Sequence, residues 1–220
     1  MLYEQPVFRL FGDRGLLVEY GSSIDIDTNK KVRSVAACLD HKAIIEATTA
    51  YRSLTILFNP ALATAKELID YISNLSCHPV KDNTSIIEVP ICYDKDFGLD
   101  LLYVANRNNI SISTLTHAYC SAEYYVYMLG FTPGFPFLGG LPNILETPRL
   151  KTPRKTVAAG SVGIAGAQTG IYPITSPGGW QIIGRTPLKI FDPYKSNPCM
   201  FKPGDRIKFK SISREEYESL

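Results

Sequence analysis

Basic residues are concentrated in one proline-flanked segment in the middle of the chain. Four cations fall within residues 149–155, and prolines at positions 148 and 153 favour extended geometry for the residues before them. Arginine suits a carboxylate or phosphate because its planar fork donates two parallel hydrogen bonds. We therefore expect Arg149 and Arg154 to bind anionic groups of a ligand. A solvated basic loop accounts for the charge pattern equally well.

Aromatic residues are concentrated just before that segment, in residues 130–140 (GFTPGFPFLGG). Phe131, Phe135 and Phe137 alternate there with glycine and proline. Exposed loops rarely carry so many large apolar side chains without packing them. The local pattern favours a rigid corner of a core, and its functional alternative is the apolar wall of a pocket or of a partner groove.

Neutral hydrogen-bonding side chains follow in two glycine-rich segments. Gln168 and Tyr172 lie in the first, and Trp180 and Gln181 follow two glycines in the second. These side chains could surround a small polar ligand, whereas turns between strands are the structural alternative. The glycine spacing matches neither a phosphate-binding P-loop nor a dinucleotide fingerprint, so we expect the chain alone to hold no cofactor.

Composition and the remaining reactive residues exclude several kinds of protein. The three histidines do not have metal-ligand spacing, so we expect no metal site, and His117 is a candidate acid or base whose alternative role is structural. Five widely spaced cysteines indicate reduced thiols in a cytoplasmic protein. A net charge of +2 gives no argument for nucleic-acid or membrane binding.

Hydrophobic patterning divides the chain near residue 80. Residues 1–80 predict a small ferredoxin-like α/β domain with an early hairpin and helices over 28–39, capped by Asp27 or Thr28, and over 62–75. Residues 81–220 predict helices over 99–107 and 111–119, followed by short strands with regular turn signals. That pattern is typical of a closed β-barrel. The expected strands after residue 40 are 44–49, 53–58, 86–92, 124–129, 161–165, 181–184, 188–191 and 206–210.

An ordered set of motifs identifies a family resemblance. The motifs are residues 123–136 (EYYVYMLGFTPGFP), 160–173 (GSVGIAGAQTGIYP), 176–180 (SPGGW), 184–187 (GRTP) and 203–205 (PGD). Together they resemble the B subunit of 5-oxoprolinase, a family also described as allophanate hydrolase subunit 1, which includes the sporulation kinase-A inhibitor. The resemblance covers nearly the whole chain. The chain departs from the family pattern at two positions. It has Phe137 where the pattern has an aromatic residue with a hydroxyl, and Ala158 where the pattern has a proline.

The resemblance implies an α+β protein in which a cyclophilin-like β-barrel follows the small domain. It implies a complex with the C and A subunits of 5-oxoprolinase, which opens 5-oxoproline to glutamate at the expense of ATP. This chain would supply one face of a site shared with the C subunit and would be inactive alone. Arg149 and Arg154 would hold anionic groups, and Gln168, Tyr172 and Trp180 would shape the pocket.

Two other functions remain open. The chain could be an inhibitor that binds the dimerisation helix of a sporulation-type histidine kinase through Phe131, Phe135 and Phe137. It could also be half of a biotin-dependent carboxyltransferase or allophanate-type hydrolase, to which another protein would bring the biotin. We rank the role in 5-oxoprolinase first.

Overall fold

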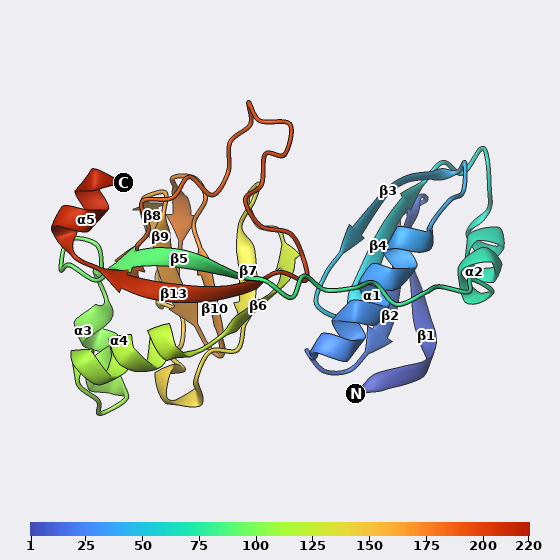
Figure 1. The fold of residues 1–220 in the computed structure, drawn as a ribbon. Helices are drawn as coiled ribbons and strands as arrows, with labels where there is room; N and C mark the ends of the chain where they lie inside the picture. Colours follow the sequence, from blue (N-terminus) through green and yellow to red (C-terminus); the bar gives the residue numbers. More distant parts are fainter. The chain divides into compact units, whose positions relative to one another are not determined.

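The computed structural model describes residues 1–220 and forms two compact units, Met1–Asp82 and Asn83–Leu220. The first unit is a mixed α/β sandwich, and the second contains a closed β-barrel (Figure 1). The predicted fold class is therefore confirmed. None of the helices has the length and apolar character that a membrane span requires.

The first unit is a four-stranded antiparallel sheet with two helices packed on it. Its elements are β1 (Leu2–Phe11), β2 (Gly15–Gly21), α1 (Ile26–Cys38), β3 (Ile44–Thr49), β4 (Ser53–Phe58) and α2 (Ala65–Ser73). The strand order β1-β2-β4-β3 resembles that of a ferredoxin-like sandwich. The difference is that the first strand of this chain, β1, forms the edge that the last strand forms in that fold. Val18 and Ile56, from the two central strands, pack with Val32 of α1 and Leu68 of α2 in one core.

Both helices of this unit begin at residues other than those predicted. The cap of α1 is Asp25, not Asp27 or Thr28, because the Asp25 carboxylate accepts the Thr28 backbone N–H at 2.8 Å. Helix α2 starts at Ala65 and not at residue 62, because Thr64 and Glu67 form a reciprocal capping box that fixes its first turn.

The second unit closes seven strands into a barrel in the order β10-β7-β6-β13-β5-β12-β9. Its elements are β5 (Ile86–Cys92), α3 (Leu101–Arg107), α4 (Ile112–Ser121), β6 (Tyr124–Leu129), β7 (Pro136–Gly139), η1 (Asn143–Leu145), β8 (Arg154–Val157), β9 (Ser161–Ala165), β10 (Gln168–Ile171), β11 (Ser176–Gly178), β12 (Gln181–Arg185), β13 (Arg206–Ile212) and α5 (Arg214–Ser219). The strands β5 and β13, from opposite ends of the unit, pair in parallel and lie side by side (Figure 1). The strands β8 and β11 form a separate two-stranded sheet.

The strand predicted over 188–191 is wrong. Only Phe191 makes a bridge there, to Cys199. Pro187 has no backbone N–H, and the N–H of Leu188 bonds the Thr186 hydroxyl at 3.3 Å instead of a neighbouring strand. A regular ladder therefore cannot form over this segment.

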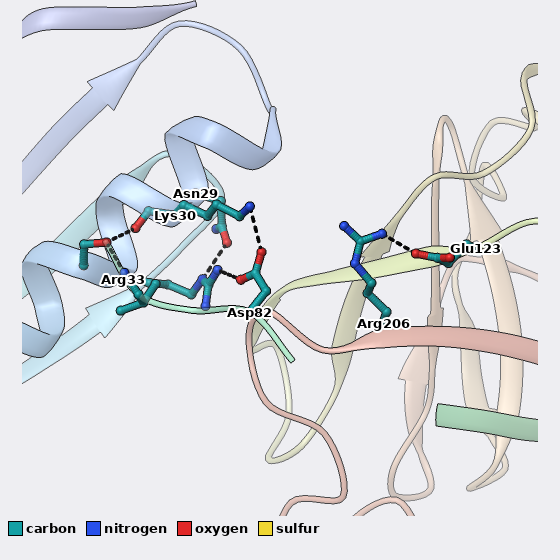
Figure 2. A network of polar contacts seen from close by, with 8 residues as sticks. Asn29, Lys30, Arg33, Asp82, Glu123 and Arg206 are labelled. Atoms are coloured by element: carbon teal, nitrogen blue, oxygen red, sulfur yellow. Dashed lines mark hydrogen bonds and ion pairs between the residues drawn. The ribbon is translucent and has the colours of Figure 1, made fainter. Parts of the chain in front are cut away.

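An ionic network ties the last residue of the first unit to α1. The Asp82 carboxylate pairs with Lys30 at 3.0 Å and with the guanidinium of Arg33, which also contacts Asn29 (Figure 2). Burial acts to raise the pKa of Asp82, but hydrogen bonds from Lys30 and Arg33 outweigh it and hold the pKa below its usual range. Within the second unit, Arg206 pairs with Glu123 (Figure 2).

Replacing Asp82→Asn is expected to loosen α1, because two cations of that helix lose their counter-charge. We expect backbone amides of α1 to exchange hydrogen about tenfold faster at neutral pH, equivalent to roughly 1–2 kcal/mol of local stability. Since the pKa of Asp82 is lowered by folding, its stabilisation is present above its ordinary pKa and is lost as the pH falls below about 4.

Hydrogen exchange read by mass spectrometry on the full chain measures this effect. The exposed Asp70→Asn on α2 is the matched control and should leave α1 unchanged. Equal protection of α1 in wild type and Asp82→Asn at neutral pH would contradict the assigned role.

Candidate functional site

Alternation along the barrel strands creates a second apolar cluster outside the barrel. Ile183 of β12 faces the interior, and its neighbour Ile182 faces outward. At the end of β10, Ile171 likewise faces the interior and Tyr172 faces outward. The outer cluster consists of Phe135, Val157, Ala165, Tyr172, Trp180 and Ile182, with Phe137 packed against it. Val157 comes from the small β8/β11 sheet, which thereby covers part of the barrel wall.

A cavity of about 310 Å³ opens beside this outer cluster. It lies at the lower end of the size range of small-molecule pockets. The lining residues are Phe131, Phe135, Phe137, Arg149, Leu150, Pro153, Tyr172, Pro177, Gly178, Gly179 and Trp180. The buried ring of Phe135 meets Trp180 at 5.3 Å and Tyr172 at 5.2 Å between centroids, both edge-to-face. These contacts hold the aromatic wall in one arrangement.

Arg149 is the one charged residue of the lining. Its guanidinium lies 5.9 Å from the centre of the Trp180 ring, within cation–π range. The residues on both sides of Arg149 are anchored: the Leu150 N–H donates to Gly179 at 2.8 Å, and the Gln181 amide donates to the Pro148 carbonyl at 2.9 Å. The loop therefore presents an exposed cation over a flat aromatic surface.

Tyr172 adds a neutral hydrogen-bonding group beside that cation. Burial raises the pKa of its phenol, although a backbone hydrogen bond from Trp180 and the charges of Arg149 and Arg154 act to lower it. The phenol is therefore protonated at neutral pH and can donate a hydrogen bond.

Arg154 supports the pocket and does not line it. Its guanidinium donates to the Asp100 carboxylate at 2.6 Å and lies 3.4 Å from the Trp180 carbonyl. The other Asp100 oxygen accepts the Ile182 N–H at 2.7 Å. One ion pair therefore joins β8, the start of α3 and β12 behind the pocket.

The structure distributes the other predicted residues between the pocket and its surroundings. Phe135 is buried in the outer cluster, Phe137 is half-buried in the lining, and Phe131 is 65% exposed at a positive φ of 64°. Gln168 is half-buried outside the lining, on the outward face of β10. His117 is exposed on α4, and its imidazole lies 3.5 Å from the Ser121 hydroxyl, outside the lining.

Sequence reasoning missed Asp100 and the role of Gly178. Asp100 lies 54 residues before its partner Arg154, and no local motif marks it. Gly178 is required because a β-carbon there would overlap the Tyr172 hydroxyl and come within 2.7 Å of its ring carbons. The two glycines before Trp180 were the available signal for this close approach.

A match to known proteins covers most of the chain. Residues 6–201 fit the family model described as carboxyltransferase domain, subdomain C and D. The chain belongs to this family. The resemblance to the B subunit of 5-oxoprolinase is confirmed as well, because proteins of that name match at 36–37% identity over more than nine-tenths of this chain.

Particular relatives show how much of each protein is shared. The 5-oxoprolinase B subunit of Bacillus subtilis is 37% identical over 94% of this chain and 93% of its own length, and that of Escherichia coli O157:H7 is 36% identical over 91% and 93%. The urea amidolyase of Saccharomyces cerevisiae is 26% identical over 100% of this chain but only 14% of its own. The crystal structure of TTHA0988 superposes with a TM-score of 0.83 at 33% identity, and the match covers 90% of this chain and 40% of that one.

The glycine pair beside Trp180 offers a matched test of the pocket geometry. Gly178→Ala is expected to push Tyr172 off its site and to lower the free energy of unfolding by about 1–3 kcal/mol. Gly179→Ala is the control, because its nearest contact would be an ordinary 3.5 Å to Pro153. Urea unfolding followed by Trp180 fluorescence measures both variants. Equal stability of the two would show that Tyr172 does not require the space at Gly178.

Proposed function

We propose that this chain is one component of an ATP-dependent 5-oxoprolinase and supplies one face of a site shared with the C subunit of that enzyme. The observation that carries the proposal is an open aromatic pocket whose only charged group is Arg149. Its lining can bind and orient a small anion through one guanidinium, one protonated phenol and several flat surfaces. The bond-breaking groups would come from the partner.

The chemistry of 5-oxoproline fits this lining. The molecule combines a carboxylate with a compact lactam ring. Arg149 can donate two parallel hydrogen bonds to the carboxylate, or to a phosphate carried by an activated intermediate. The ring faces of Trp180 and Phe137 suit the lactam body, and Tyr172 can donate to an oxygen on it. An unstrained lactam resists water, so ring opening requires the activation that ATP supplies.

The relatives support the same proposal. Those of Bacillus subtilis and Escherichia coli are named as subunits of 5-oxoprolinase and match over nearly their entire length. Such a name implies further components, and a pocket without its own reactive groups is suited to that arrangement. We infer that the A and C subunits of 5-oxoprolinase are the partners and that ATP is used by the complex.

One observation favours a second candidate, half of a biotin-dependent carboxyltransferase. The family is described as a carboxyltransferase domain, and the urea amidolyase of Saccharomyces cerevisiae matches along the whole of this chain. A carboxylated carrier would then deliver its group to the same pocket. The two candidates differ in what they need: ATP and a lactam for the first, a biotinylated protein for the second.

Reconstitution tests the proposed function. We expect no turnover of 5-oxoproline by the isolated chain and ATP-dependent glutamate formation when the A and C subunits are added. Arg149→Met should lower kcat/KM of the complex about tenfold to a hundredfold, because one charge-assisted contact to the substrate is lost. Glutamate release at several 5-oxoproline concentrations measures this effect.

Lys151→Met is the matched control, because Lys151 is an exposed cation of the same loop that lies outside the lining. It should retain wild-type kcat/KM. Turnover by the isolated chain, or full activity of Arg149→Met in a complex that assembles normally, would contradict the proposal. Transfer from a carboxylated biotin carrier without ATP would favour the second candidate.

A further inference from the structure

The strand β1 departs from the sheet near its start. Leu2 pairs with Gly21 and Val7 pairs with Glu19, so the four residues Tyr3–Pro6 stand opposite Tyr20 alone. Pro6 has no backbone N–H and cannot restore a ladder bond. The surplus residues must therefore arch away from β2, as in an enlarged β-bulge.

A cavity of about 320 Å³ lies beside this arch, within the first unit. Its lining residues are Leu2, Tyr3, Glu4, Gln5, Pro6, Phe8, Tyr20, Lys31, Val35, Ile72, Ser73 and Leu75. Apolar side chains from β1, α1 and α2 form much of its wall. It shares no residue with the pocket beside Trp180.

Tyr20 belongs to the lining, and its buried hydroxyl lacks a hydrogen-bond partner. The residue is 4% exposed, and its hydroxyl makes no hydrogen bond. A buried hydroxyl without a partner destabilises a fold, because it loses its hydration and gains no hydrogen bond in return. Burial, with a smaller contribution from the Cys77 thiol, raises the pKa of Tyr20, so the hydroxyl stays protonated and can donate. An acceptor oxygen at this position would relieve the penalty.

Charge in the lining favours an anionic acceptor. Lys31 is exposed at the cavity, and it pairs with no carboxylate, since Asp82 is held by Lys30 and Arg33. Glu4 is the one acidic residue of the lining and is exposed on the arch, so it is free to turn into solvent. A neutral oxygen would accept the hydrogen bond of the Tyr20 hydroxyl but would leave the Lys31 ammonium without a counter-charge.

We propose that this cavity binds a small amphipathic carboxylate. One carboxylate oxygen accepts the Tyr20 hydroxyl, the Lys31 ammonium offsets the charge, and the apolar body packs against Val35, Ile72 and Leu75. This site is separate from the proposed 5-oxoprolinase pocket and does not depend on that function.

Titration of the full chain with sodium hexanoate tests the proposal. We expect saturable changes in the amide NMR signals of β1, Tyr20 and the middle of α1, with hexylamine binding at least about tenfold more weakly. Tyr20→Phe should weaken hexanoate binding about tenfold or more, because the donated hydrogen bond is lost. Lys31→Met should weaken hexanoate binding and remove the preference over hexylamine.

Two variants control for general effects. Tyr71→Phe removes a phenol whose oxygen accepts the Asp40 N–H outside the cavity, and Lys66→Met removes an exposed cation of α2 that does not line it. Both should bind hexanoate like wild type. Tyr20→Phe is expected to fold, since it removes a hydroxyl without a partner, and circular dichroism checks this.

The proposal is overturned if hexanoate causes no saturable change at these residues or if folded Tyr20→Phe binds with the wild-type Kd. Equal binding of hexylamine and hexanoate overturns the assignment to carboxylates. If Tyr20→Phe fails to fold, Lys31→Met decides: unchanged hexanoate affinity overturns the proposal, and weakened affinity with the Lys66→Met control intact supports it.

Discussion

The two apolar faces of the barrel wall are the constraint on which the second unit depends. Strand alternation sends Ile183 and Ile171 inward and Ile182 and Tyr172 outward, so closing the barrel buries only half of the apolar wall. The outer half must be covered by something else. The β8/β11 sheet covers part of it through Val157, and the ring cluster covers more. The pocket is the part of this face that the chain's own elements leave open.

The ion pair between Arg154 and Asp100 holds the β8/β11 sheet on the barrel wall. A partly buried pair gains little net free energy from its charges, because both groups lose hydration. Its value here is positional. Asp100 also accepts the Ile182 N–H, so one carboxylate links β8 to β12. The loop before β8 is fixed in turn, and the position of Arg149 over Trp180 follows from that.

Sequence patterns predicted the elements whose signals are local. The strands 44–49, 53–58, 86–92, 124–129 and 161–165 match the structure residue for residue, because β-branched or aromatic residues recur along each of them. The strands β7, β8, β10 and β11 contain only three or four residues, most with glycine or proline, and their pairing is set by the barrel. Residue type also indicated Arg149 and Trp180 as residues of the binding site. The difference in role between Arg149 and Arg154 depends on Asp100, which only the fold brings near.

Both cavities lie where a regular ladder cannot continue. Pro6 lies in the irregular part of β1 opposite Tyr20, Pro153 directly precedes β8, and Pro177 lies within β11 at an irregularity in its pairing with β8. Proline removes a donor and fixes φ, so regular pairing is interrupted at these positions, and the irregular backbone leaves space beside it. The side chains then decide what the space can hold. A guanidinium over an aromatic ring suits a flat anion, whereas a cavity lined by a tyrosine, a lysine and aliphatic side chains suits a carboxylate with an apolar body.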